Sequence, residues 1–414
     1  MSFGSTLAKA TDFSVTATAG DARACRLTVN GMTMETPSLF PVINFYGGGR
    51  KGSLFGGSTH RTVKELINGD DRVDGVDCSS FFEGAMMSVG SLTDYGIRRD
   101  LLDEYLADPV KSRPEFEGFD GMLFTDSGGY KNLTQGGLDG SDFEIELNQQ
   151  TVFEMQKALG GEILVNLDLP IQPDDSFDER VQKARQTAEN AIEFLRVSKD
   201  YPAARFLTVQ GYNYSMIDTF FDELQAVFGN MEISKYFDGI ALGGLVPKKD
   251  NKGVLIDAVQ GCRQVMNERG LSGLPLHVLG ISRSSIPILA AVGADTFDSS
   301  SYIQAAINGK YYRSLFDTVR VDEVDLSKCD CPVCSSEELR SRMRGNAEYR
   351  KDKMGPVAVH NQYVQMQELE KIRNCIRDGG KAGLVEYIDN TVGRNRSTRR
   401  FAHRVVNESL GGYF

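Results

Sequence analysis

Short apolar runs recur through the first 300 residues, and several of them end in Gly, Asp or Ser. Their length and composition predict about eight strands. Between them, apolar residues recur at helical spacing, for example from Val181 to Leu195 and from Leu255 to Met266. Strands that alternate with helices indicate a parallel sheet. The eight expected strands are 38–44, 73–79, 121–126, 163–168, 206–210, 238–243, 276–281 and 294–298.

The region from about residue 25 to 315 is long enough for a (β/α)₈ TIM barrel. A doubly wound open sheet is the competing architecture, but the GxGxxG that opens its nucleotide-binding form does not follow the first strand. The Gly-rich segment 46–53 is not a phosphate-binding P-loop either, because Lys51 precedes Gly52. We therefore expect a TIM barrel over residues 1–320, with this segment as a loop.

The pattern changes after about residue 325, where three helical stretches follow one another at 337–347, 363–378 and 384–390. Charge changes as well: residues 340–404 carry fifteen Lys and Arg against seven Asp and Glu, although the whole chain has a net charge of -11. A basic region joined to an acidic body favours a polyanionic partner. We expect residues 321–414 to form a basic helical appendage.

Composition excludes several classes of protein. The chain has 414 residues, 41% apolar and 25% charged, which is ordinary globular usage. No signal segment opens it, and the apolar run 286–294 is half the length that a membrane span needs. Seven cysteines are too few for a disulfide scaffold. We expect a soluble, cytoplasmic protein that does not bind membranes.

Three of the cysteines, Cys329, Cys331 and Cys334, fall within six residues. A tight turn can present three such thiolates to one Zn²⁺, which needs a fourth ligand. Of the four histidines, His360 opens a helical pattern downstream and can complete a Cys₃His site. Because protein would fill all four positions, this zinc would be structural, and the chemistry must lie elsewhere.

Catalytic groups of such barrels lie at the carboxyl ends of the strands. The expected strand ends carry three carboxylates, an amide and several glycines, which would converge on one mouth. They are Asp126, Asp168, Gln210, Gly243, Gly244, Gly280 and Asp298.

This set of side chains favours chemistry at an anomeric carbon. It lacks the nucleophile and histidine of acyl transfer and the His-x-His pair of barrel metallohydrolases. Two carboxyl groups can instead attack the sugar carbon and protonate the leaving group. The remaining Asp, Gln and backbone N–H groups can match the edge of a purine.

In their order along the chain, these residues resemble the tRNA-guanine transglycosylase family, whose members exchange a guanine in a polynucleotide for a 7-deazaguanine. The resemblance spans roughly residues 25 to 380. It is carried by segments 36–43 (TPSLFPVI), 125–130 (TDSGGY), 210–211 (QG), 242–245 (LGGL), 297–298 (FD) and the Cys-x-Cys-x-x-Cys with His360.

The resemblance implies that Asp298 is the nucleophile that attacks C1′ and that Asp126 is the general acid and base. It implies that the heterocycle is bound by Asp168, Gln210, Ser127, Gly243 and Gly244. The target base would have to leave its stack to reach this pocket. Basic residues near the zinc helices would hold phosphates.

Departures from the family pattern bear on the substrate. Bacterial queuosine-type enzymes place a glutamate after the Gly-Gly-Leu element, whereas this chain continues with Val246-Pro-Lys-Lys249. The segments FDSSSY, LVP and CPVC look more like the archaeal-type branch, which takes preQ0. That branch usually continues into further RNA-binding domains, for which 414 residues leave no room. Archaeal-like motifs at a bacterial-like length resemble the DNA-directed relatives, which insert 7-deazaguanines into DNA as part of a modification system. We therefore expect DNA as the substrate, with tRNA as the alternative.

Two other functions fit parts of the sequence. A non-catalytic, zinc-stapled subunit would explain the appendage, but the chain keeps Asp126, Asp168 and Asp298. A barrel glycoside hydrolase would explain the carboxylates but not the zinc site. The family resemblance also makes a homodimer, or a complex with partner proteins of a modification system, an expectation.

Overall fold

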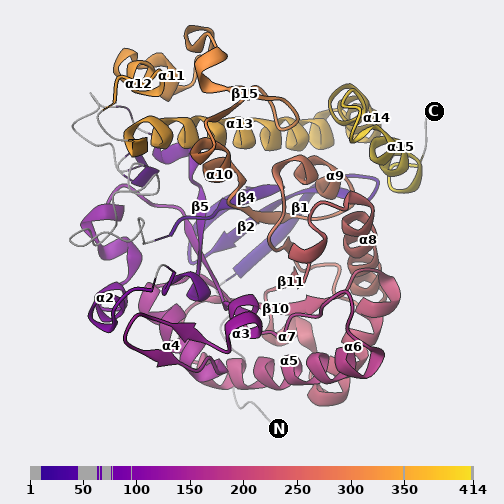
Figure 1. The fold of residues 1–414 in the computed structure, drawn as a ribbon. Coiled ribbons are helices and arrows are strands. Elements are labelled where there is room, and N and C mark those ends of the chain that lie inside the picture. Colours follow the sequence, from indigo (N-terminus) through magenta and orange to yellow (C-terminus); the bar gives the residue numbers. More distant parts are fainter. Residues whose placement is uncertain are drawn as a thin grey trace.

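The computed structural model describes residues 11–44, 63–64, 66–67, 76, 78–94, 96–347 and 350–411 (Figure 1). Its centre is an eight-stranded parallel sheet in the order β4-β13-β12-β11-β10-β9-β6-β5. The two outer strands meet where Val42, just after β4, bridges Met86 of β5, and the Ile43 amide donates to the Met86 carbonyl at 2.9 Å. The sheet is therefore a nearly closed TIM-like barrel, as expected.

The barrel strands follow the predicted series with one correction. Seven coincide with expected strands, whereas the run predicted at 73–79 lies partly outside the described residues and its end, Ser79–Phe81, is a 3₁₀ turn. The eighth strand is β5. The bounds are β4 Ser38–Pro41, β5 Gly84–Ser88, β6 Met122–Asp126, β9 Ile163–Val165, β10 Ala204–Gln210, β11 Gly239–Gly243, β12 Leu276–Val278 and β13 Thr296–Ser299.

Helices surround the sheet, and several begin at a polar cap that ends the preceding loop. Asn148, Asn213 and Asn251 each accept a hydrogen bond from a backbone amide of the first turn, and Ser176 forms a capping box with Glu179. These caps fix where each loop at the mouth ends. The helices are α2 Arg99–Tyr105, α3 Gly129–Gln135, α4 Gln149–Leu159, α5 Phe177–Val197, α6 Tyr214–Phe228, α7 Ile233–Tyr236, α8 Lys252–Glu268, α9 Ile286–Ala291 and α10 Ser301–Ile307.

An antiparallel sheet that the sequence analysis did not predict precedes the barrel. It consists of β1 (Thr11–Ala19), β2 (Ala22–Val29) and β3 (Met32–Thr36), paired in that order. Its buried apolar side chains join those of the barrel interior in one core, which contains Leu27, Val29, Met34, Phe40, Met86, Met122, Phe124, Ile163, Val165, Ala204, Phe206 and Ala241. The sheet therefore closes the floor of the barrel.

The rest of the chain is mainly helical, as expected, and crosses one side of the barrel (Figure 1). The long helix α13 packs on α10 and on the floor sheet. It begins ten residues before His360 and continues through Pro356, because the buried side chains that follow Pro356 pack against the core. The elements are β14 Lys310–Tyr312, β15 Thr318–Arg320, α11 Pro332–Ser335, α12 Glu337–Met343, α13 Arg350–Asp378, α14 Gly380–Tyr387, a π-helical turn Ile388–Gly393 and α15 Arg399–Glu408; a small hairpin, β7 Leu138–Asp139 and β8 Glu144–Ile145, flanks α3.

Two predictions from the sequence are not tested by the described residues. The Gly-rich segment 46–53 lies outside the described residues, and the division at residue 320 stays a prediction. Within the part of the chain that the structure describes, no helix combines the length and apolarity needed to cross a membrane.

Candidate functional site

The carboxyl ends of the barrel strands enclose a cavity of about 190 Å³. The three predicted carboxylates, Asp126, Asp168 and Asp298, all line it. Its described walls contain no Lys or Arg, so the negative charge of the carboxylates is not neutralised there. The lining residues are Val42, Met86, Ser88, Asp126, Gly129, Tyr130, Asp168, Pro170, Gln172, Gly243, Gly244, Val246, Pro247, Leu279, Gly280 and Asp298.

Asp126 ends β6 and is held by two donors. The Ser88 hydroxyl donates to Oδ2 at 2.7 Å, and the Gly128 amide donates to the same oxygen at 3.1 Å. Burial raises the pKa of Asp126, and the neighbouring charge of Asp298 raises it further, against the effect of these hydrogen bonds. Asp126 is thus a fixed carboxyl group that keeps a proton more readily than an exposed aspartate does.

Asp168 follows β9 and forms a hydrogen-bonded unit with two other predicted residues. Its Oδ1 lies 3.1 Å from the Ser127 hydroxyl, and its Oδ2 accepts a hydrogen bond from the Gln210 amide nitrogen. The Gln210 oxygen in turn accepts from the Ile171 amide at 2.5 Å, which fixes the orientation of the amide. Burial, with a smaller contribution from Asp126, raises the pKa of Asp168 to about 7.

Glycines allow this close arrangement. A side chain on Gly129 would meet Asp168 Oδ1 at 2.3 Å, so only glycine lets the first turn of α3 approach that carboxylate. Gly244, just after β11, has a φ of +75°, and a Cβ atom there would lie 3.0 Å from Gln210 Oε1. A flat ligand can therefore approach the backbone at Gly243 and Gly244.

Asp298 lies in β13, which is four strands away from β9 in the order of the barrel sheet. Asp298 therefore faces Asp168 across the cavity. The Gly280 amide donates to its Oδ1 at 2.8 Å. Asp298 is 6% exposed, so it reaches the cavity but little bulk water. The structure thus places the three predicted carboxylates and the predicted glycines around one cavity, whereas Gln210 and Ser127 lie behind Asp168 and contact its carboxylate.

Two further residues at the cavity have no role in the sequence analysis. The Ser88 hydroxyl donates to Asp126, and Ser88 is the last residue of β5. This strand is short and contains no β-branched residue, so its sequence does not predict a strand. Tyr130 lies in the TDSGGY segment; it lines the cavity and is half exposed, so its ring is available for stacking on a base.

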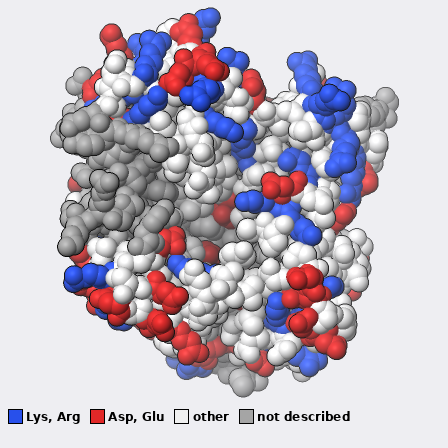
Figure 2. Space-filling model, viewed as in Figure 1, with Lys and Arg blue, Asp and Glu red and all other residues white. Residues whose placement is uncertain are grey.

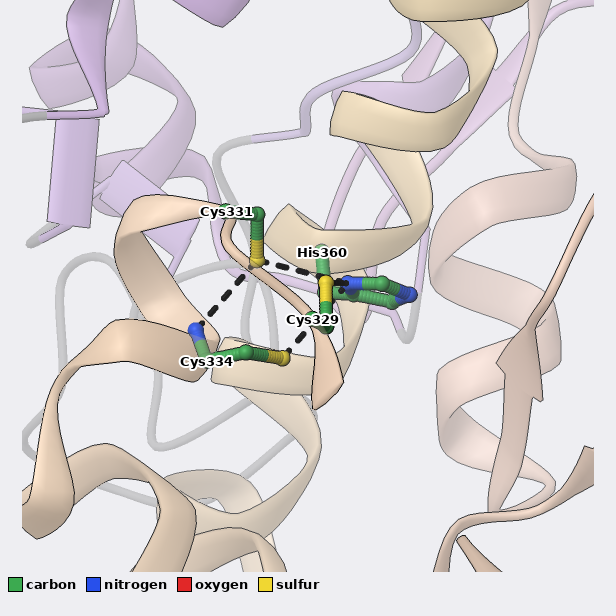
Figure 3. Close-up of side chains that lie close together, drawn as sticks. All are labelled: Cys329, Cys331, Cys334 and His360. Atoms are coloured by element: carbon green, nitrogen blue, oxygen red, sulfur yellow. Dashed lines mark hydrogen bonds between the residues drawn. The ribbon is translucent and has the colours of Figure 1, made fainter. Parts of the chain in front are cut away.

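The predicted cysteine and histidine ligands also lie together (Figure 3). His360 Nδ1 is 3.7, 3.4 and 3.7 Å from the Sγ atoms of Cys329, Cys331 and Cys334. A tetrahedral zinc with bonds of about 2.3 Å to sulfur and about 2.05 Å to nitrogen separates S and N by about 3.6 Å. The four residues therefore form a Cys₃His cluster that can hold a metal ion.

Neighbouring groups orient this cluster. His360 Nε2 lies 2.9 Å from the Tyr312 carbonyl, so it donates there and leaves Nδ1 for the cluster. The Tyr311 ring stacks on His360 at 3.7 Å. Hydrogen bonds from Cys331 and Cys334 lower the pKa of the Cys329 thiol, which favours a thiolate.

Comparison with known proteins identifies the family of the chain. Residues 103–393 match the family described as queuine tRNA-ribosyltransferase (TGT), and the chain belongs to this family. Several archaeal proteins named tRNA-guanine(15) transglycosylase are similar to it. The one from Aeropyrum pernix is 30% identical over 292 residues, which is 70% of this chain and 52% of that protein.

Two other relatives with the same name extend the similarity. The Pyrococcus abyssi protein is 26% identical over 90% of this chain and 56% of its own length. The Haloferax volcanii protein is 26% identical over 86% of this chain and 60% of its own length. The chain thus spans about half to three fifths of these curated relatives.

Proposed function

We propose that the protein exchanges a guanine in a polynucleotide for a 7-deazaguanine through a covalent bond between Asp298 and C1′. The observation that carries this proposal is the cavity itself, where three carboxylates meet without a neighbouring Lys or Arg among the described walls. Such a cavity suits a reaction with positive charge on the sugar, because the transition state at C1′ resembles an oxocarbenium ion.

The reaction needs two roles for carboxyl groups. Asp298 attacks C1′ and the glycosidic C–N bond breaks; its electron pair leaves with guanine, which takes a proton from Asp126. The raised pKa of Asp126 supports its role as the acid. In the second half, ionised Asp126 takes a proton from the incoming base, whose nitrogen attacks C1′ and releases the Asp298 carboxylate.

The Asp168 unit would recognise the base. Its carboxylate can accept hydrogen bonds from the N–H groups of a guanine edge, and Ser127 and Gln210 hold that carboxylate in place. The backbone at Gly243 and Gly244 lines the same cavity. Tyr130 would stack on the ring. Val246 and Pro247 line the cavity where a bacterial-type enzyme has a glutamate, which supports a neutral, preQ0-type substituent on the incoming base.

We propose tRNA as the polynucleotide. The expectation of DNA rests on the length of the chain alone. The matched family and the archaeal relatives all carry tRNA in their names, which supports the alternative instead. Duplex DNA is the contrasting substrate in the test below.

A basic surface beside the cavity supports a polyanionic substrate. Near the start of α15, the Phe401 ring lies beside Gly253 in the first turn of α8, and Ser409, just after α15, accepts a hydrogen bond from Gln260 farther along α8. Because α8 begins at the mouth, α15 also begins there. Figure 2 shows Lys and Arg gathered over α14 and α15, and the exposed arginines of this rim are Arg394, Arg396, Arg399 and Arg400.

The Cys₃His cluster would hold a structural zinc. Three thiolates and an imidazole are a typical zinc donor set, and protein would fill all four positions. The ion would fix the 329–334 turn to α13 and would take no part in the base exchange. A homodimer or a partner complex stays a prediction, which sedimentation of the purified protein would test.

The test is incubation with labelled guanine or preQ0 and, separately, unmodified tRNA and duplex DNA, followed by denaturing electrophoresis. We expect label in tRNA and a covalent protein–tRNA adduct, which Asp298→Ala abolishes and the exposed control Asp250→Ala retains. Label in DNA alone would refute the tRNA assignment. An adduct that survives Asp298→Ala would refute the nucleophile.

A further inference from the structure

His277 lies directly below the proposed nucleophile and has no role in the mechanism above. It lies in β12 and is fully buried in the barrel interior. Its ring stacks on Phe124, with centroids 4.4 Å apart and planes inclined by 27°, and its edge contacts Phe40. The ring is therefore fixed by aromatic packing.

The two ring nitrogens of His277 have different surroundings. Nδ1 lies 3.0 Å from the Thr296 hydroxyl. Nε2 lies 3.4 Å from Asp298 Oδ1 and has no hydrogen-bond partner within the described part of the chain. A buried N–H without an acceptor is unfavourable, so the neighbouring carboxylate is the acceptor that Nε2 can reach with a small movement.

The oxygens of Asp298 differ in the same way. Oδ1 accepts the Gly280 amide at 2.8 Å and faces His277 Nε2. The structure gives Oδ2 no hydrogen bond among the described residues. Oδ1 is thus held by Gly280 and faces His277, whereas Oδ2 is free to face the cavity, where C1′ would lie.

We propose that His277 is a positioning residue for Asp298, an inference that rests on the proposed function. Because Nε2 faces a carboxylate oxygen, which only accepts, we assign the proton of the neutral ring to Nε2, and the Thr296 hydroxyl then donates to Nδ1. Nε2–H then donates to Oδ1, and the contact shortens when a substrate draws the carboxylate into place, as such contacts do on formation of a reactive complex. Asp298 attacks through Oδ2.

Two substitutions at His277 separate this role from packing. His277→Phe keeps an aromatic ring among Phe40 and Phe124 but removes the donor. His277→Gln keeps an amide N–H at a reach similar to that of Nε2 but loses the ring. A positioning role predicts that Gln is the better replacement for the covalent step, whereas a packing role predicts that Phe is better.

The experiment measures the single-turnover rate of adduct formation between full-length protein and an unmodified tRNA transcript, together with tRNA affinity and thermal unfolding. We expect His277→Phe to slow adduct formation by about tenfold to a hundredfold, with a Kd for tRNA within about twofold of wild type, and His277→Gln to restore most of the rate. Equal rates for both variants, or a faster rate for Phe, would overturn the proposal.

Thr296→Val provides a second test if a His277 variant fails to fold. It removes the hydroxyl that donates to His277 Nδ1 and keeps a β-branched side chain of similar volume in β13. We expect a severalfold slower covalent step with unchanged tRNA affinity, and an unchanged rate would contradict the proposed tautomer. Wild-type adduct formation tests the proposed function separately, because that function stands even if all three variants react normally.

Discussion

Asp295, just before β13, and Asp298, near the other end of that strand, lie three residues apart, and their surroundings are opposite. Asp295 lies at the floor, where its carboxylate accepts hydrogen bonds from Arg23, Arg263 and the Leu276 amide. Although burial acts to raise its pKa, the two guanidinium groups lower it. Asp298 lies at the mouth, where the cavity walls bring further carboxylates and no described cation.

The difference separates stability from chemistry within one strand. The floor satisfies a buried charge with two opposite charges, and the arginines hold the N-terminal sheet and α8 to the barrel. The mouth instead places carboxylates near one another in a buried cavity. Burial raises the pKa of Asp126 and Asp168, and in each case a neighbouring carboxylate raises it further. Perturbed carboxylates in a cleft are typical of functional sites.

Replacement of Asp298 is the strongest test of the mouth. Asp298→Asn keeps the shape but removes the proposed nucleophile, so we expect the rate of adduct formation to fall by about 10⁴-fold or more. Because it also removes a charge from an acidic cavity, the free energy of unfolding should stay the same or rise. Rapid-quench gels and urea unfolding measure the two effects, and a large loss of stability would contradict this division.

Loss of the metal cluster should instead affect the fold. Cys331→Ser removes a buried thiol of the Cys₃His cluster. With the proposed zinc bound there, we expect loss of the metal and of about 4 kcal/mol or more of unfolding free energy, because losing a structural metal is among the largest effects of single substitutions. Metal analysis and urea unfolding provide the measurements. Cys375→Ser, in α13 but outside the cluster, is the control and should retain zinc.

Replacement of Asp295 tests the floor. Asp295→Asn leaves Arg23 and Arg263 buried without their shared partner, which should cost about 3–5 kcal/mol of unfolding free energy. Activity per folded molecule should be retained. Asp222→Asn breaks an exposed pair with Arg269 and should cost less than about 1 kcal/mol by the same urea titration. Similar losses for both variants would contradict the special role of the floor cluster.

The contrast between floor and mouth also explains what the sequence could predict. The mouth residues follow apolar runs, so the alternation of strands and helices was enough to place Asp126, Asp168, Gln210 and Asp298 together. The cysteine spacing located the metal cluster for a similar local reason. The interaction of Arg23 with Asp295 joins residues 272 positions apart, and nothing in the local pattern of either residue indicates it.

Other features were missed for related physical reasons. Strand β5 is short and lacks β-branched residues, so Ser88 was not recognised as a strand end. The helix α13 continues through Pro356, where burial overrides a residue that usually ends helices. The contact between His277 and Asp298 depends on the register of β12 and β13, which only the folded barrel defines.

The carboxylates of the mouth and the floor should change the pH dependence of the unfolding free energy in opposite directions, because the fold raises the pKa of Asp168 and lowers the pKa of Asp295. The pKa of Asp168 is raised from 3.8 to about 7 in the fold, so its burial destabilises the protein increasingly as pH rises through that range. Asp168→Asn should therefore be more stable than wild type by a margin that grows between about pH 4 and pH 7 and reaches roughly 2–4 kcal/mol. Urea unfolding at several pH values measures it. A margin independent of pH would refute the shift.

The smallest expected effect concerns the rim. Arg399 and Arg400 are exposed at the start of α15, beside the mouth. If they bind phosphates, Arg399→Ala/Arg400→Ala should weaken tRNA affinity about threefold to tenfold near 0.1 M salt and lower the slope of log K against log salt by about 1 to 2. The affinity for free base should not change, because the cavity is intact.

The matched control is Arg196→Ala/Lys199→Ala, at the far end of α5, which removes the same charge. Equal effects of the two pairs would show that only net charge matters, whereas a selective loss at α15 would place the polynucleotide across this rim.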